Sequence, residues 1–242
     1  MKKWITPHGT IYTLFEDMAN QNHLLVAGMS GSGKSVVVNG IMSTLLYKSP
    51  SRVGFILIDP KRVELSAYRN LPHTIRYASE PMDMVSALQY AIAICDSRYM
   101  EMQRRGERLY GGGDVYVIID EWADLMTTNR RVVAPMVQRL AQIGRASKVH
   151  CILCTQTPIA KVLPTEIKCN FDARVGLRTR SAQDSRNIIG RAGLELLPRY
   201  GQGLYMTPAG DTLYNIPYVP EAEQNRLINH WLEQNKKRWW QR

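Results

Sequence analysis

The fold is decided by the segment Gly28-Met29-Ser30-Gly31-Ser32-Gly33-Lys34-Ser35. It matches the pattern GxxxxGK[ST] in full, and its glycines let backbone N–H groups curl around phosphate oxygens. The apolar run His23–Ala27 precedes it, and a helix is predicted from residue 34 to about residue 47. A glycine-rich turn alone would not explain a lysine and a serine at the last two positions. The segment therefore predicts a phosphate-binding loop between a strand and a helix.

The residues of this loop predict ATP and Mg²⁺ as ligands. Lys34 is expected to reach the β- and γ-phosphates, and Ser35 to offer its hydroxyl to magnesium. The predicted ATP contacts are Gly28, Met29, Ser30, Gly31, Ser32, Gly33, Lys34, Ser35 and Val36.

A second apolar strand at residues 115–120 ends in two acids, Asp120 and Glu121. Asp120 is predicted to hold magnesium through its water shell. Glu121 is predicted to be the general base that orients and deprotonates the attacking water. Two solvated acids at a strand end are the alternative, and the upstream phosphate loop makes it the weaker one.

A third candidate lies at the end of the strand predicted over residues 149–155, where Thr155 is followed by Gln156. Gln156 is predicted to sense the γ-phosphate and to link the nucleotide state to nearby loops. An ordinary strand-end turn is the competing interpretation.

Strands and helices alternate along the chain, which predicts an α/β fold with a mostly parallel sheet and helices on both faces. We expect one domain over residues 1–242, with a short lead at 1–22 and a final helix and basic tail at 220–242. The predicted strands cover residues 23–27, 53–59, 115–120, 149–155, 173–177, 203–206 and 212–216. The other predicted helices cover residues 81–105, 132–145 and a segment from 220, with loops at 105–114 and 158–164.

Charge and composition narrow the function classes. The formal net charge is +10 and the isoelectric point is about 9.6. This excess favours a polyanion such as nucleic acid, and a solvated basic surface without a partner is the alternative. No apolar run approaches the roughly 20 residues that span a bilayer, and no secretory signal begins the chain. We therefore expect a cytoplasmic protein.

Cys151 and Cys154 form a CxxC pair, a spacing that can indicate zinc or redox chemistry. They fall in the predicted strand at 149–155, where residues three apart point to opposite faces. We expect two buried thiols rather than a metal site.

Several blocks resemble the motor core of FtsK/SpoIIIE-type DNA translocases over about residues 23–231. In chain order they are HLLVAGMSGSGKSVVVN, ILIDPKRVELSAY, VIIDEWADLM, RLAQIGRASKVHCILCTQTP, IKCNFDARVGLRTRSAQDSRNIIG and GQGLYMTPAG. The resemblance implies a RecA-like P-loop NTPase fold, an ATP hydrolase, a hexameric ring, and movement along DNA threaded through the ring.

The resemblance also implies residue roles. Arg145 would act on the ATP of the neighbouring subunit, although a cation near a helix end is the simpler interpretation. Two loops, at residues 127–131 and 158–166, would face DNA in the bore, or be ordinary solvated loops. The implied DNA contacts are Thr128, Asn129, Arg130, Arg131 and Lys161.

Four other functions stay open. A related motor could serve conjugation or genome packaging, or a type VII system could move polypeptide. A nucleotide-gated binding protein could hydrolyse slowly and move nothing. The blocks that match contain no membrane helices and no DNA-orienting module, so we expect a compact motor or an excised motor domain.

Overall fold

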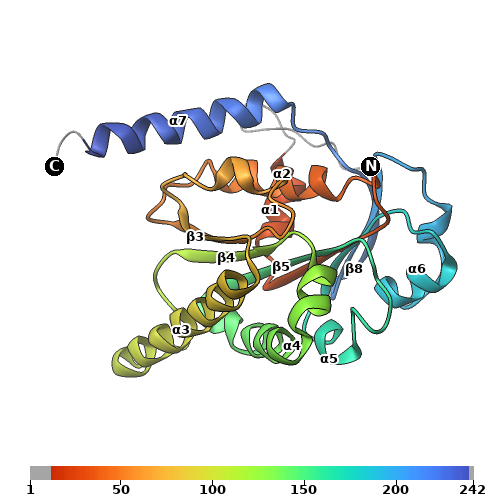
Figure 1. Cartoon of the computed structure of the whole chain (residues 1–242), viewed down its shortest axis with the longest axis horizontal. Helices are drawn as coiled ribbons and strands as arrows, with labels where there is room; N and C mark the ends of the chain where they lie inside the picture. The colour runs from red at the N-terminus through yellow and green to blue at the C-terminus, as the bar shows by residue number, and fades with distance from the viewer. Residues whose placement is uncertain (1–11, 240–242) are drawn as a thin grey trace.

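One sheet of eight strands organises the molecule (Figure 1). The computed structural model describes residues 12–239, and the side chains of 14–235. Across the sheet the order is β3-β2-β4-β5-β1-β6-β7-β8; the first six are parallel and the last two antiparallel. The strands are β1 His23–Ala27, β2 Val53–Ile58, β3 Thr74–Ala78, β4 Asp114–Ile119, β5 Val149–Thr155, β6 Ala173–Gly176, β7 Gln202–Thr207 and β8 Gly210–Asn215.

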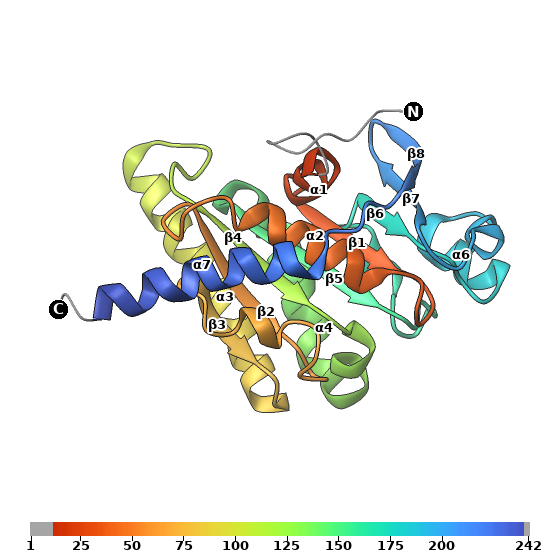
Figure 2. The ribbon, with the colours of Figure 1, turned by 90° about the horizontal axis from the view of Figure 1, so that it is seen from above.

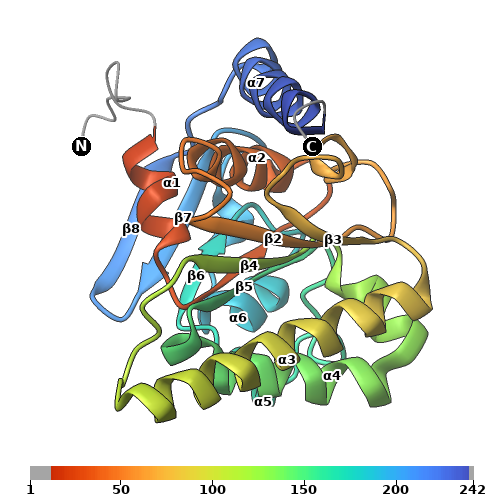
Figure 3. The same ribbon diagram turned by 90° about the vertical axis from the view of Figure 1, so that its left-hand side faces the viewer.

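Helices cover both faces of this sheet (Figure 3). On one face lie α1 Tyr12–Ala19, α2 Lys34–Leu45 and α7 Glu221–Trp239; on the other lie α3 Pro81–Arg105, α4 Trp122–Ser147, α5 Thr165–Lys168 and α6 Ala182–Ile189. Within residues 12–239, no helix has the length and apolar character needed to cross a membrane.

Alternation along the central strands explains the two layers. In β1, Leu24 and Val26 join the cluster beneath α1 and α2, whereas Leu25 and Ala27 join the cluster beneath α3 and α4. A strand buried on both faces reads as a continuous apolar run. The predicted α/β fold with a mostly parallel sheet is therefore confirmed.

The strand order places the candidate residues along one edge. The strands β2, β4, β5 and β1 are consecutive neighbours and run parallel, so their carboxyl ends meet there. Asp59, Asp120, Gln156 and Gly28 each follow one of these ends. Ligand sites of open α/β sheets lie outside this edge.

The predicted loop at residues 127–131 is wrong, and so is a helix start at residue 132. The helix α4 begins at Trp122, and it contains that whole segment. Glu121 caps its first turn by accepting a hydrogen bond from the Ala123 amide, and Leu125 is buried. The interruption is confined to Asn129, whose φ of −151° and ψ of 46° lie outside the helical region. Two helical pieces thus join at a kink, with no loop between them.

Four elements were not predicted: α1, α5, α6 and β3. The helix α5 begins at Thr165, inside the loop predicted at residues 158–166. The strand β3 is the outermost of the sheet, and most of its side chains are partly exposed, including Ile75 at 44%. An edge strand with one covered face lacks the continuous apolar run that reveals a central strand.

The two cysteines of the CxxC pair do lie on opposite faces. Cys151 belongs to the cluster beneath α4 and Cys154 to the cluster beneath α2. Burial raises the pKa of the Cys151 thiol to about 12, so it stays protonated. The CxxC spacing therefore reflects the packing of β5 side chains into the two core layers.

The last helix, α7, crosses over α2 (Figure 2). The Trp231 indole N–H donates to the main-chain oxygen of Leu46 at 2.8 Å, and its ring meets His73 edge-on. Of the basic tail at 236–242, the side chains of 236–239 and residues 240–242 lie outside the described part.

A buried histidine begins β1 at the opposite edge of the sheet. His23 is 5% exposed, and its Nδ1 accepts a hydrogen bond from the Cys151 amide at 3.1 Å. Burial, helped by the nearby charge of His150, lowers its pKa from 6.5 to about 4, against a weaker opposing effect of the Ala141 backbone. The folded state therefore favours the neutral ring.

This histidine should make stability fall in mild acid. Its contribution to the free energy of unfolding is complete above pH 6.5 and is lost as the pH falls toward 4. The loss from His23 alone amounts to about 3 kcal/mol. Urea denaturation at several pH values measures the slope of the free energy of unfolding against pH. In His23→Asn, whose amide oxygen can still accept from Cys151, the slope between pH 6.5 and 4 should be shallower. Equal slopes in the two proteins would refute the assignment.

Candidate nucleotide-binding site

The phosphate loop, residues 28–35, has the backbone that its glycines permit. Gly31 and Gly33 have φ values of +71° and +104°, a region that favours glycine. The Gly28 amide donates to the Thr155 oxygen at 3.3 Å, and the Met29 amide to the Arg178 oxygen at 2.8 Å. The loop is thus tied to the ends of β5 and β6, the neighbours of β1.

Lys34 lies across this loop with its ammonium largely buried. Its Nζ donates to the main-chain oxygens of Gly28 and Met29, both at 3.0 Å. Burial lowers its pKa, and the carboxylates of Glu121 and Asp120 oppose that shift. An ammonium has three N–H donors, so one is left for a phosphate oxygen.

Ser35 and a cluster of acids face each other beside the loop. The Ser35 hydroxyl donates to Oε1 of Glu64 at 2.6 Å. Burial raises the pKa of Asp120 to about 7, and repulsion from Asp59, Glu64 and Glu121 adds to the shift. A carboxyl group such as Asp120, whose ionisation is opposed by burial and by neighbouring acids, indicates a place suited to a cation.

These residues fit a magnesium ion that arrives with a nucleotide. Magnesium prefers hard oxygen ligands and is held by one or two carboxylates together with substrate phosphates. In the described part of the chain, no three His, Cys, Asp or Glu residues are grouped to hold a metal by themselves. Asp59 is fully buried, and its Oδ1 has no hydrogen-bond partner there. Such an orphan oxygen suits a site completed by a cation.

Glu121 is held rigidly at the end of β4. It is 2% exposed, and its Oε1 accepts from the Thr155 hydroxyl at 2.9 Å and from the Ala123 amide at 3.2 Å. The Gln156 amide lies 3.2 Å from both carboxylate oxygens, and Nζ of Lys61 is 3.6 Å from Oε2. The carboxylate therefore has one defined position between β4 and β5.

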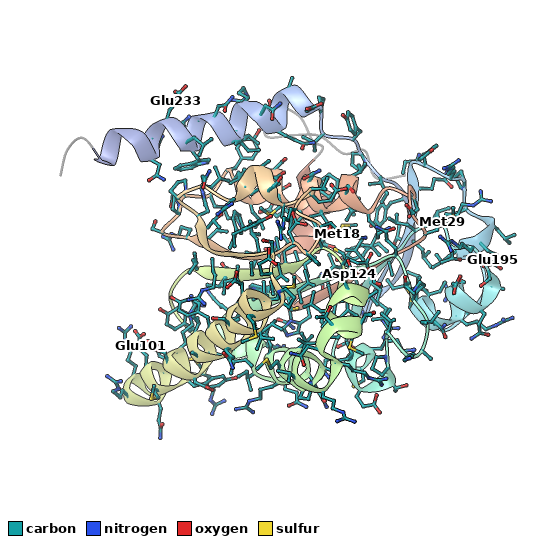
Figure 4. The ribbon with its side chains drawn as sticks, in the orientation of Figure 1. Met18, Met29, Glu101, Asp124, Glu195 and Glu233 are labelled. Atoms are coloured by element: carbon teal, nitrogen blue, oxygen red, sulfur yellow. The ribbon has the colours of Figure 1, made fainter. Side chains whose placement is uncertain are left out.

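Gln156 and Met29 line the same small pocket, with Pro158 and Thr179. Figure 4 labels Met29 in the phosphate loop and Asp124 in the first turn of α4. The structure thus brings the predicted sensor to the phosphate loop, because β5 lies between β4 and β1.

Arg145 is not brought to the phosphate loop of its own chain. It is exposed near the end of α4 and lines a pocket with Asn22, His23 and Ala173, at the amino ends of β1 and β6. The phosphate loop follows the opposite end of β1. A strand of five residues separates the two places by roughly 15 Å.

The candidate DNA contacts lie on two adjoining segments. Arg130, Arg131 and Lys161 are exposed. The Trp122 indole donates to the Val162 oxygen at 2.7 Å and so ties the loop at 158–164 to the start of α4. The Thr128 hydroxyl, predicted to contact DNA, donates to the Asp124 oxygen of its own helix at 2.8 Å.

Three residues at this site were not predicted from the sequence: Asp59, Lys61 and Glu64. They belong to the stretch that follows β2, within the block ILIDPKRVELSAY. The available signal was an aspartate directly after a fully apolar strand, the same signal that revealed Asp120.

Comparison with known proteins identifies relatives over most of the chain. The model of the FtsK/SpoIIIE family matches residues 6–114 and 113–160. DNA translocase FtsK 1 of Neisseria meningitidis serogroup B is 34% identical over 250 residues, an alignment that covers 88% of this chain and 31% of that protein. DNA translocase FtsK of Caulobacter vibrioides is 34% identical over 251 residues, covering 86% and 31%. The chain thus spans about a third of the length of these curated relatives.

Solved structures share the fold at lower identity. The pCW3 conjugation coupling protein TcpA, in a structure with ATPgS, superposes with a TM-score of 0.76 at 23% identity, covering 88% of this chain and 66% of that one. The type VII secretion ATPase EccC of Thermomonospora curvata gives 0.71 at 20% identity, covering 87% and 28%. These likenesses establish the fold alone.

We expect replacement of the cation Lys34 and replacement of the acid Glu121 to cause different defects. Lys34→Ala should weaken ATP binding by roughly 100-fold or more, because losing one partner of a buried charge pair costs about 2–5 kcal/mol. Glu121→Gln should retain binding and lose roughly 100- to 10,000-fold in ATP turnover, because an amide cannot accept the proton. Fluorescent-nucleotide titration and phosphate release measure the two effects.

Asp124→Asn is the matched control, since it neutralises an acid that also lies near Lys61, at 4.0 Å. It should behave as wild type. Wild-type turnover in Glu121→Gln would remove Glu121 from the role of base.

Proposed function

Because the chain belongs to the FtsK/SpoIIIE family, we propose that it is an ATP-hydrolysing motor that moves along DNA. The observation that carries the proposal is the meeting of Lys34, Ser35, Asp120 and Glu121 at one sheet edge, next to a phosphate loop. Curated relatives named as DNA translocases favour DNA as the track. The net charge of +10 agrees with a polyanionic partner.

The residues divide the chemistry between them. The phosphate loop holds ATP through its backbone N–H groups, and Lys34 balances charge on the β- and γ-phosphates. Magnesium, bound through Ser35 and Asp120, would supply charge stabilisation to the phosphates. Glu121 orients the attacking water and takes its proton. Gln156 reports the nucleotide state to the loop at 158–164, which follows it directly.

Arg145 acts in this proposal on the ATP of a neighbouring copy, within a ring that we take to be a hexamer. Its exposure and its distance from its own phosphate loop support a role between subunits. An arginine in such a position stabilises charge on the transferring phosphoryl group.

Mixing of variants tests this shared site. Arg145→Ala should bind ATP and lose roughly 1,000-fold or more in turnover. Adding Lys34→Ala protein should restore part of the activity, since some interfaces then pair an intact phosphate loop with an intact Arg145. The control Arg139→Ala, an exposed arginine on the same helix, should keep full turnover. No recovery at any ratio, with mixed assemblies verified, would argue against the shared site.

The DNA path is proposed to follow the segment of α4 at residues 127–131, which contains the kink at Asn129, and the loop at 158–164, which Trp122 ties to the start of α4. Replacing Arg130, Arg131 and Lys161 with alanine should lower the salt slope of DNA binding by about one unit per lost phosphate contact. Basal turnover should persist while its stimulation by DNA disappears. Duplex and single-stranded DNA are compared in binding and phosphate-release assays over a salt series.

A triple variant of the exposed Arg104, Arg105 and Arg108 removes the same charge near the far end of α3 and serves as control. Unchanged affinity and stimulation in the first triple variant would move the DNA path elsewhere. Absence of any DNA response in the wild type would favour export of polypeptide or a nucleotide-gated binding protein.

A further inference from the structure

The loop at residues 59–65 contacts both the phosphate loop and the acid at the end of β4, yet no step proposed above uses it. Oε1 of Glu64 accepts a hydrogen bond from the Ser35 hydroxyl at 2.6 Å. Three residues earlier, Lys61 lies 3.6 Å from Glu121. One short segment after β2 therefore touches two groups of the nucleotide site.

Internal contacts hold this loop in shape. Oδ2 of the buried Asp59 accepts from the Leu65 amide at 3.0 Å, and the Leu65 side chain is fully buried. The Arg62 amide donates back to the Asp59 oxygen at 3.2 Å, with Arg62 at a φ of +58°. A non-glycine residue in this region is uncommon and marks a constrained turn. Glu64 precedes the buried Leu65, so its direction toward Ser35 is set by the fold.

We propose that Glu64 is a positioning residue of the magnesium site: it accepts the hydrogen bond of the Ser35 hydroxyl and so leaves that oxygen's lone pairs for the metal. This inference rests on the proposed binding of ATP with magnesium. A serine hydroxyl has one proton and two lone pairs. When a carboxylate accepts the hydrogen bond of that hydroxyl, the serine oxygen turns only its lone pairs toward a cation. Partners of this kind orient metal ligands, and their loss costs 10- to 100-fold in metal affinity.

The surroundings agree with this role. Ser35 and Glu64 both line an open pocket, together with Val36, Asn39 and Tyr218. Glu64 itself is only partly buried. A substitution there should leave the fold intact. The negative charge of Glu64 also adds to the acids around Asp120, which favours a divalent cation next to Ser35.

The test measures the magnesium dependence of nucleotide binding, separately from turnover. A fluorescent ATP analogue is titrated into the full chain at rising Mg²⁺, and again in EDTA. Glu64→Ala should raise the Mg²⁺ concentration for half-maximal tightening roughly tenfold or more. Glu64→Gln keeps an acceptor oxygen and should raise it by roughly threefold or less, because a neutral acceptor forms a hydrogen bond about half as strong. Binding in EDTA should not weaken in either variant.

A double-mutant cycle shows whether Glu64 acts through Ser35. In a Ser35→Ala background, Glu64→Ala should cause no further shift, because the hydrogen bond it would remove is already gone. Glu233→Ala, an exposed glutamate on α7 (Figure 4), is the control and should match wild type.

Three results would overturn the proposal. They are an unchanged magnesium midpoint in Glu64→Ala, equal losses in the Ala and Gln variants, and additive effects in the cycle. Each leaves the proposed ATPase intact, because wild-type binding still tightens with magnesium. A wild-type protein that binds no nucleotide would overturn this inference together with the proposed function.

Discussion

Charge crowded at one edge of the sheet is the constraint on which the rest of the structure depends. Lys34 is largely buried among main-chain oxygens, with Asp120 and Glu121 close to it, and Asp59 is close to Asp120. Buried charges are tolerated only when they are paired and hydrogen-bonded. The parallel strands satisfy this condition, since their carboxyl ends bring a phosphate loop, two acidic strand ends and a polar strand end side by side.

The two hydrophobic layers make that edge rigid. Strands buried on both faces cannot shift without exposing apolar side chains. Glu121 shows the result most directly, because amides and a hydroxyl from α4 and β5 fix its carboxylate. It also caps α4, so the helix that carries Arg130 and Arg145 begins from the same carboxylate. The site and the helix are thus joined by one side chain.

Two sets of contacts connect the nucleotide site to neighbouring loops. One runs from Gln156 into the loop at 158–164, which the Trp122 indole fastens to α4. The other runs through the loop at 59–65, where Lys61 faces Glu121 and Glu64 faces Ser35. The first leads toward the proposed DNA contacts, and the second stays within the nucleotide site. Both are built from short segments that follow carboxyl ends of the parallel strands.

The sequence by itself determined the phosphate loop, the acidic strand end and the parallel sheet, because each depends on local patterning. Glycines and Lys34 define a loop shape, and an apolar run ending in Asp120 defines a buried strand with a polar tip. Starting α4 at Trp122 places Trp122, Leu125 and Met126 in the core, and the kink at Asn129 appears only in the tertiary structure. The hydrogen bond between Ser35 and Glu64 joins residues 29 apart in the chain. Only the tertiary structure could bring them together, because their meeting depends on β2 and β4 packing beside β5 and β1. The alternation of strands and helices along the sequence does not fix that strand order.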